Sequence, residues 1–368
     1  MAKKRQGSSG KRSKNSGGKG KFRKRFLTGF FSFLLVAGII GVAVGYKYYK
    51  YIYVKNVELG DKKEVYVCIP TNSNFDDVKK ILYGQHIISD TVSFQWLSDH
   101  KAYSLNVKAG RYLITNHMNN NELINMLRAG KQTPVRLTFN NIRTKEQLVS
   151  RICKNLEADS ISLLNLLSDK AFLEKYDLNP DNVMCIFIPN TYEIFWNTSA
   201  EKYFEKMHDE YEKFWNKTRS DKAAEIGLSP EKAVILASIV YSETKKKDEM
   251  SKIAGVYMNR INRGMPLQAD PTVIFAIGDF SIKRVLNEQT RYNSPYNTYI
   301  HTGLPPGPIC LPEGYVIDKV LDYEKNDYLY FCAKDDLSGY HSFAETSAQH
   351  ALNAQRYHQA LNRLRIKK

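Results

Sequence analysis

The sequence contains one carboxylic acid whose surroundings suit proton transfer. Ser229 and Pro230 predict the start of a helix over residues 230–244, as an N-cap and a first-turn residue. The stretch 233–240 is apolar nearly all round, so this helix is expected to be buried. Glu243 follows apolar members of the helix by three, four and seven residues, which predicts that its carboxyl lies on the apolar face.

Two features of this position raise the pKa of a carboxyl group. Burial disfavours the charged form, and the C-terminal end of a helix carries partial negative charge. An acid that stays protonated near neutral pH can donate a proton to a glycosidic oxygen. The same spacing also fits a plainer alternative, in which Glu243 only marks where a buried helix meets solvent.

Three polar loops follow this helix within about forty residues. They span 266–273, 293–299 and 302–308, and proline or glycine stiffens each of them. Rigid loops that carry Tyr, Asn, Gln and Thr are typical of a carbohydrate cleft, where rings stack on aromatics and amides pair with hydroxyl groups. Each loop taken alone is equally compatible with an ordinary surface connection.

The elements that must position these groups predict a helix-rich domain over residues 135–368. A strand is expected at 135–139, followed by a helix that Thr144 and Gln147 begin as a capping box. Further helices are expected at about 200–216 and 230–244, and a last one from Thr346 to Leu364. With its few short strands, this half indicates an α+β fold.

A smaller domain is expected over residues 58–134. Strands are predicted at 65–69 and 110–114, and helices at 74–83, 92–97 and 121–128, the last closed by Gly130. Strand, two helices, strand is the plan of a small sugar-binding LysM-like module. A plain α+β spacer has the same pattern, so the elements alone leave both interpretations open.

The N-terminal segment predicts a single membrane-spanning helix. Residues 26–46 are twenty-one uncharged residues, about 31 Å of helix, which matches the hydrocarbon core of a bilayer. The preceding tail, 1–25, carries eleven Lys or Arg and no acid, and we expect it to be disordered and cytoplasmic. The remaining chain would then lie outside the cytoplasm, held at the cell membrane. A cleaved signal peptide would have a shorter apolar region.

The net charge of +16 comes from this basic segment. Residues 1–57 hold 14 of the 54 Lys and Arg and no acid, which leaves 40 basic against 38 acidic residues, or +2, for the rest. We therefore expect contact with lipid headgroups and no nucleic-acid partner. The five cysteines have no metal-ligand spacing, and we expect neither a metal nor another cofactor.

Several ordered segments resemble the YceG-like family, the endolytic murein transglycosylases of the MltG type. They are 235–243 (ILASIVYSE), 256–260 (VYMNR), 267–273 (LQADPTV), 294–299 (SPYNTY), 303–307 (GLPPG), 328–331 (YLYF) and 341–343 (HSF). The resemblance extends from about residue 60 to 364. It implies a membrane-anchored lytic transglycosylase with Glu243 as the catalytic glutamate and a LysM-like module before the catalytic domain.

The implied reaction cuts nascent peptidoglycan strands between N-acetylmuramic acid and N-acetylglucosamine, which leaves 1,6-anhydro ends and terminates strand elongation. On this hypothesis Glu243 protonates the leaving oxygen, the acetamido group of the substrate assists, and Glu243 then accepts the proton of the 6-hydroxyl. The candidate substrate-binding residues are Gln268, Asp270, Thr272, Tyr296, Asn297 and His341.

Several alternatives stay open at this point. Asp270 could be a second catalytic carboxylate, which would make the protein an inverting hydrolase. His341 could be a structural histidine. A different class of function is a non-catalytic scaffold that binds peptidoglycan and cell-wall synthases; such synthases are also possible partners of an enzyme.

Overall fold

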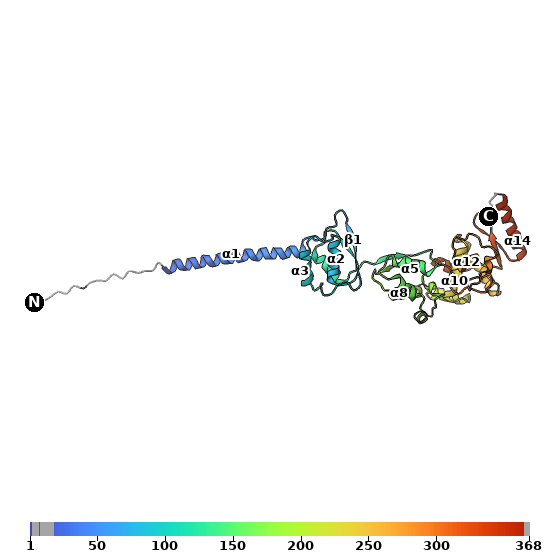
Figure 1. The fold of residues 1–368 in the computed structure, drawn as a ribbon, viewed down its shortest axis with the longest axis horizontal. Coiled ribbons are helices and arrows are strands. Elements are labelled where there is room, and N and C mark those ends of the chain that lie inside the picture. The colour runs from blue at the N-terminus through green and yellow to red at the C-terminus, as the bar shows by residue number, and fades with distance from the viewer. Residues whose placement is uncertain (2–6, 8–17, 364–368) are drawn as a thin grey trace. The chain divides into compact units, whose positions relative to one another are not determined.

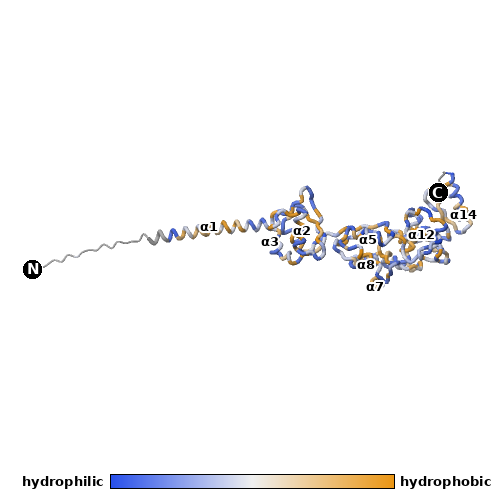
Figure 2. Tube along the Cα trace, viewed as in Figure 1, coloured by the Kyte–Doolittle hydropathy of each residue, from blue (hydrophilic) through white to orange (hydrophobic). Residues whose placement is uncertain are grey.

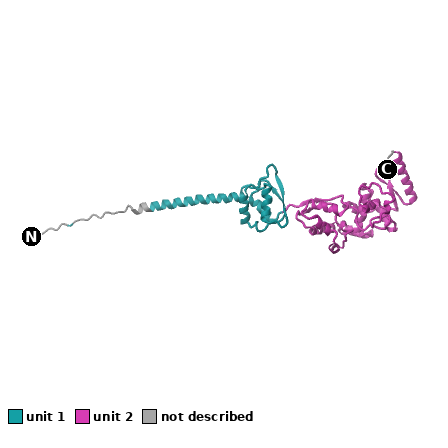
Figure 3. Ribbon diagram, viewed as in Figure 1, with its two compact units in different colours: residues 1–131 teal, residues 132–368 magenta. Residues whose placement is uncertain are grey.

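The computed structural model describes residues 18–363 together with residues 1 and 7. The chain divides into two compact units, residues 1–131 and residues 132–368 (Figure 3). Each unit has its own hydrophobic core.

The first unit combines a long helix with a small α+β body (Figure 1). Its elements are α1 (Gly18–Tyr53), β1 (Glu64–Ile69), α2 (Phe75–Gly84), α3 (Thr91–His100), β2 (Gly110–Thr115) and α4 (Asn120–Ala129). β1 and β2 pair antiparallel, with Glu64 opposite Thr115 and Ile69 opposite Gly110. The strand–helix–helix–strand order predicted for this region is confirmed.

Local sequence signals set the helix ends of this body. Asn74 begins α2 with a capping box to Asp77, and Asn119 begins α4 with a capping box to Glu122. Gly130 ends α4 in the left-handed conformation, with φ of 66°.

Helix α1 is longer than the predicted segment 26–46 at both ends, and residues 18–25 of the predicted tail are helical. Residues 2–6 and 8–17 of that tail lie outside the described residues. Figure 2 shows an apolar middle and a polar C-terminal end in α1. Among the described residues, α1 is the one helix that is both long enough and apolar enough to cross a membrane.

The last turns of α1 are fixed to the small body. The ring of Tyr48 stacks on Trp96 of α3, with 4.8 Å between centroids. The amide of Asn120 donates to the carbonyl of Tyr51 at 2.9 Å and to the hydroxyl of Ser93 at 2.8 Å. The end of the apolar helix and the small body therefore form one structural piece.

The second unit is helix-rich and carries two short antiparallel sheets, β3–β4 and β5–β6. Its strands are β3 (Val135–Thr138), β4 (Thr191–Ile194), β5 (Tyr330–Ala333) and β6 (His341–Ala344). Its helices are α5 (Lys145–Cys153), α6 (Ser160–Leu166), α7 (Lys170–Leu173), α8 (Ala200–Phe214), α9 (Lys217–Glu225), α10 (Pro230–Glu243), α11 (Met250–Asn262), α12 (Asp270–Ile277), α13 (Gly314–Leu321) and α14 (Ser347–Arg363), with 3-10 turns at Glu174–Tyr176, Val183–Ile186 and Gln289–Arg291. The mixed α+β class with short strands is confirmed.

Helix α10 is a central element of this core. Its residues 233–240 are all buried, and it packs against α11 and α13. Ser229 caps it and Pro230 occupies its first turn, as predicted.

One predicted cap differs from the structure. Thr144 caps α5 by accepting from the backbone of Gln147, but the side chain of Gln147 accepts from Arg143, one residue before the expected partner.

Candidate active site

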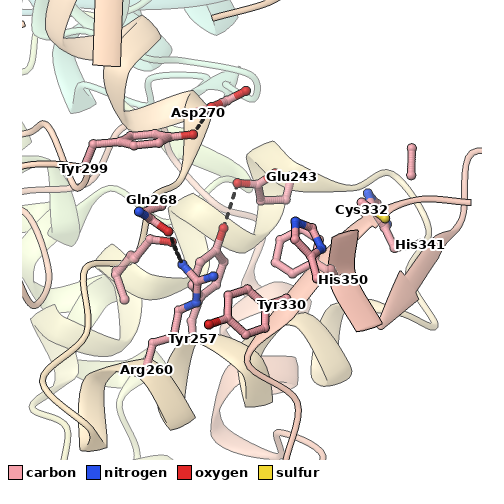
Figure 4. Close-up of a pocket in the computed structure, with 13 residues that line it drawn as sticks. Glu243, Tyr257, Arg260, Gln268, Asp270, Tyr299, Tyr330, Cys332, His341 and His350 are labelled. Carbon is pink, nitrogen blue, oxygen red and sulfur yellow. Dashed lines mark hydrogen bonds between the residues drawn. The ribbon is translucent and has the colours of Figure 1, made fainter. Parts of the chain in front are cut away.

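A cavity of about 450 Å³ in the second unit receives the side chain of Glu243 (Figure 4). Its walls come from the end of α10, from Tyr257 and Arg260 of α11, from the 267–270 segment and from the β5–β6 hairpin. Glu243 is the last residue of α10, so the buried helix carries the carboxyl to the cavity wall, where it is half-buried. The prediction that this carboxyl lies on the apolar side of its helix agrees with this position.

The surroundings of Glu243 raise its pKa to about 7. Burial is the largest cause, and the negative charge of Asp270 acts in the same direction. A hydrogen bond from Tyr257 and the positive charge of Arg260 lower the pKa and offset part of this effect. A group with this pKa can release and take up a proton near neutral pH, as a general acid and base must.

Tyr257 is the direct partner of Glu243. Its hydroxyl donates to Oε1 of Glu243 at 2.7 Å, while its ring is buried and lies edge-on to Phe331. Because the ring is enclosed, the hydroxyl is held in place and orients one carboxyl oxygen, which leaves the other for a ligand.

Arg260 is a buried cation that holds the cavity together. Its Nη1 donates to the carbonyl of Leu267 at 2.8 Å and its Nε to the carbonyl of Leu329 at 2.6 Å. These bonds join α11 to the segment that carries Gln268 and to the start of the β5–β6 hairpin. Arg260 also contacts the side chain of Gln268 at 3.3 Å (Figure 4).

Gln268 and Asp270 lie at the exposed rim of the cavity. Gln268 has a φ of 51°, a conformation uncommon for a residue with a side chain, and its backbone N–H is held by the carbonyl of Thr298. Oδ1 of Asp270 accepts from the hydroxyl of Tyr299 at 2.5 Å. Burial and this bond to Asp270 raise the pKa of Tyr299, so it stays a donor.

His341 lies on the opposite wall, in β6, and is held by a carboxylate. Its Nδ1 lies 2.9 Å from Oε2 of Glu249, and its backbone N–H donates to Oε1 of the same residue at 2.9 Å. Glu249 is buried at the start of α11. A carboxylate accepts at Nδ1, which leaves Nε2 as the ring nitrogen without a proton in the neutral imidazole.

The other three predicted binding residues do not line the cavity. Thr272 is buried, and its hydroxyl donates to the carbonyl of Ala269 at 2.7 Å. Asn297 is also buried, and its amide donates to the carbonyls of Thr290 and Tyr292. The ring of Tyr296 packs on Phe275, 4.8 Å between centroids. Their side chains fix the loops behind the cavity.

Several residues at or behind the cavity were absent from the predicted site, among them Tyr257, Arg260, Tyr299 and Glu249. Tyr257, Arg260 and Tyr299 lie within segments that had been noted for their pattern, so a signal existed for them. Glu249 follows three lysines and an aspartate, and nothing in its local sequence distinguishes it. Within the described residues, no group of three or more His, Cys, Asp or Glu is arranged to hold a metal ion.

Comparison with known proteins gives consistent results. The sequence profile of the YceG-like family matches residues 67–356. A Bacillus subtilis (strain 168) protein named endolytic murein transglycosylase is 28% identical over 317 residues, which cover 82% of this chain and 87% of that protein. A protein of the same name from Streptococcus pneumoniae (strain D39) is 27% identical over 364 residues, which cover 90% of this chain but 64% of that longer protein.

A solved structure is also similar. The crystal structure of a YceG-like protein from Listeria monocytogenes has 27% sequence identity and a TM-score of 0.52, and the match covers 79% of this chain and 99% of that one.

Proposed function

Because this chain belongs to the YceG-like family, we propose that it is an endolytic lytic transglycosylase that cuts peptidoglycan strands. The names of the Bacillus and Streptococcus relatives support the substrate class and the reaction. The observation that carries the proposal is the position of Glu243, whose pKa is raised to about 7 in a cavity large enough for part of a glycan.

In the proposed reaction Glu243 serves both halves. It protonates the oxygen that leaves when the bond between N-acetylmuramic acid and N-acetylglucosamine breaks, while the acetamido group of the substrate assists at C1. The resulting carboxylate then accepts the proton of the muramic acid 6-hydroxyl, which attacks C1. The product is a 1,6-anhydro end, and cutting nascent strands in this way would end their elongation.

The cavity residues have separate proposed roles. Gln268 and Asp270 at the rim, and His341 on the opposite wall, would contact the sugar. Thr272, Tyr296 and Asn297 would hold the loops that carry the rim. Asp270 keeps its alternative role as a second carboxylate of a hydrolase, because it too lines the cavity.

The first unit would place this site at a membrane. We propose that α1 is a single-pass anchor with its basic end in the cytoplasm, and that residues 135–368 work outside the cytoplasm. We further propose that residues 58–134 are a LysM-like module that binds glycan; their strand–helix–helix–strand order supports this assignment. Cell-wall synthases remain proposed partners.

Product analysis tests the proposal. The full-length chain in detergent is incubated with uncross-linked glycan strands, and the products are identified by mass spectrometry. We expect internal cuts and 1,6-anhydro ends. Reducing ends would support the hydrolase with Asp270 as second carboxylate, and strands that stay intact would support the non-catalytic scaffold.

A further inference from the structure

A second cavity, of about 180 Å³, shares a wall with the cavity of Glu243. Ser242 lines the second cavity and Glu243 the first, while Pro271 lines the second and Asp270 the first. Consecutive Cα atoms are about 3.8 Å apart, so the end of α10 and the start of α12 separate two adjacent openings. The two cavities therefore lie along the same two segments, the end of α10 and the start of α12.

Two cations line the second cavity, and no acid does. The guanidinium of Arg143 lies 4.6 Å from the ring centre of Phe280, and Nζ of Lys245 lies 4.6 Å from that of Tyr241. Among the described residues, neither Arg143 nor Lys245 forms a salt bridge with a carboxylate. Arg143 therefore lies against the ring of Phe280, and Lys245 lies over the ring of Tyr241 and donates to the carbonyl of Tyr241 at 3.4 Å. In the described part of the chain, neither charge is paired with a carboxylate.

Both charges influence the thiol of Cys310, which lies in the wall of this cavity. Burial raises the pKa of the Cys310 thiol, while a hydrogen bond with Ser242 and the charges of Arg143 and Lys245 lower it. Cys310, Arg143 and Lys245 all line this cavity, so the two cations lie at the same cavity although they are about a hundred residues apart in sequence. Burial and the negative charge of Glu313 raise the pKa of the Tyr241 hydroxyl, but Glu313 does not line the cavity.

The remaining walls indicate the kind of anion that fits. Ile274, Phe275, Phe280 and Ile309 supply an apolar and aromatic surface. A carboxylate attached to a small apolar group would satisfy both parts: its oxygens pair with the cations, and its body packs on the rings. In peptidoglycan this chemistry occurs at the free C-terminal end of an uncross-linked stem peptide, where an alanine methyl group lies beside the carboxylate.

We propose that the cavity of Arg143 and Lys245 binds the carboxylate of a stem peptide on the strand being cut. This inference rests on the proposed function, since it assigns a peptide subsite to the same enzyme. Such a subsite would make the protein selective for strands that keep their peptides, and among these for strands that are not yet cross-linked.

The test compares two substrates and three full-length proteins in detergent. The substrates are uncross-linked strands with pentapeptide stems and the same strands after an amidase has removed the peptides. The proteins are the wild type, the Arg143→Gln/Lys245→Gln double variant and Lys247→Gln. Lys247 is a matched control, because it lies over Tyr315, 4.3 Å from the ring centre, and does not line the cavity.

We expect the wild type to favour peptide-bearing strands and the double variant to lower the ratio of kcat/KM for the two substrates about tenfold, the scale of a charge-assisted pair. Lys247→Gln should keep the wild-type ratio. Strands whose peptides end in an amidated carboxylate should be cut with the same kcat/KM as strands from which the peptides have been removed. Binding of labelled strands to Glu243→Gln protein gives the same comparison without turnover.

The outcomes separate this inference from the proposed function. A ratio near one in the wild type, or a ratio that the double variant leaves unchanged, overturns the peptide subsite while cleavage itself stands. If no strand is cut, the proposed function fails, and the binding comparison alone then decides the peptide subsite.

Discussion

The hydroxyl of Tyr257 donates to Oε1 of Glu243 at 2.7 Å, from the middle of one buried helix to the end of another. This bond stabilises the carboxylate and so opposes the burial that raises the pKa of Glu243. The balance of these two effects, together with the charges of Asp270 and Arg260, leaves the pKa at about 7.

Removing this bond should change the pH dependence of cleavage. In Tyr257→Phe the carboxylate loses its donor, so the pKa of Glu243 should rise above about 7. Because the acid must be protonated to donate, the alkaline limb of kcat/KM should move to higher pH by about one pH unit. Tyr292→Phe, at an exposed tyrosine, is the control. An alkaline limb that stays in place in Tyr257→Phe would contradict the role of this bond.

Folding stability should show the same raised pKa. The folded protein holds the Glu243 proton up to about pH 7, whereas the unfolded chain releases it near 4.5. The folded state thus binds more protons between these values, and stability falls as pH rises through this window. Glu243→Gln has no such proton to lose. From pH 4 to pH 8 the difference in unfolding free energy between the variant and the wild type should therefore shift by about 2–3 kcal/mol in favour of the variant. Thermal midpoints at several pH values test this; a pH-independent difference speaks against a raised pKa.

Glu249 and His341 should act as one unit. Because Glu249 accepts from both the ring and the backbone of His341, either Glu249→Gln or His341→Gln should lower kcat, by roughly tenfold to a hundredfold. The double variant should cost little more than one substitution. The control is Asp336→Asn, which removes an exposed ion pair with Lys334 in the turn between β5 and β6. This variant should leave kcat unchanged. Additive effects would mean that the two residues work independently.

Gly255 should not tolerate a side chain. A Cβ there would lie 2.3 Å from the carbonyl oxygen of Glu324 and 2.7 Å from Nδ2 of Asn326. Gly255→Ala should therefore lower the unfolding free energy by about 1–3 kcal/mol. Gly84→Ala is the matched control in another helix, where nothing lies within 4 Å, and it should be neutral or slightly stabilising. Equal thermal midpoints for the two variants would contradict the close packing of α11.

Local signals in the sequence were enough to predict the elements that carry the site. Ser229 and Pro230 gave the start of α10, and the apolar spacing placed the carboxyl of Glu243 on the inner side of this helix. Gly130 gave the end of α4. These signals act over one or two helical turns, so they are readable without the fold.

Contacts between distant segments were not readable in this way. Glu249 and His341 are 92 residues apart, and no periodicity links them. Thr272 and Asn297 were predicted to face a ligand because polar loops often do, but both turn inward and satisfy buried backbone groups. Composition identifies a polar loop, whereas the direction of each side chain depends on which backbone groups the fold leaves unpaired.

The most direct test of the account is the activity of Glu243→Gln. Full-length wild-type and variant proteins in detergent are given uncross-linked glycan strands, and new chain ends are counted by mass spectrometry. We expect the variant to lose at least about a thousandfold in rate while its thermal midpoint at pH 5 stays near that of wild type, since one carboxyl performs both proton transfers. Cleavage by a folded Glu243→Gln protein at a rate near that of wild type would contradict the assignment of Glu243 as the acid and base.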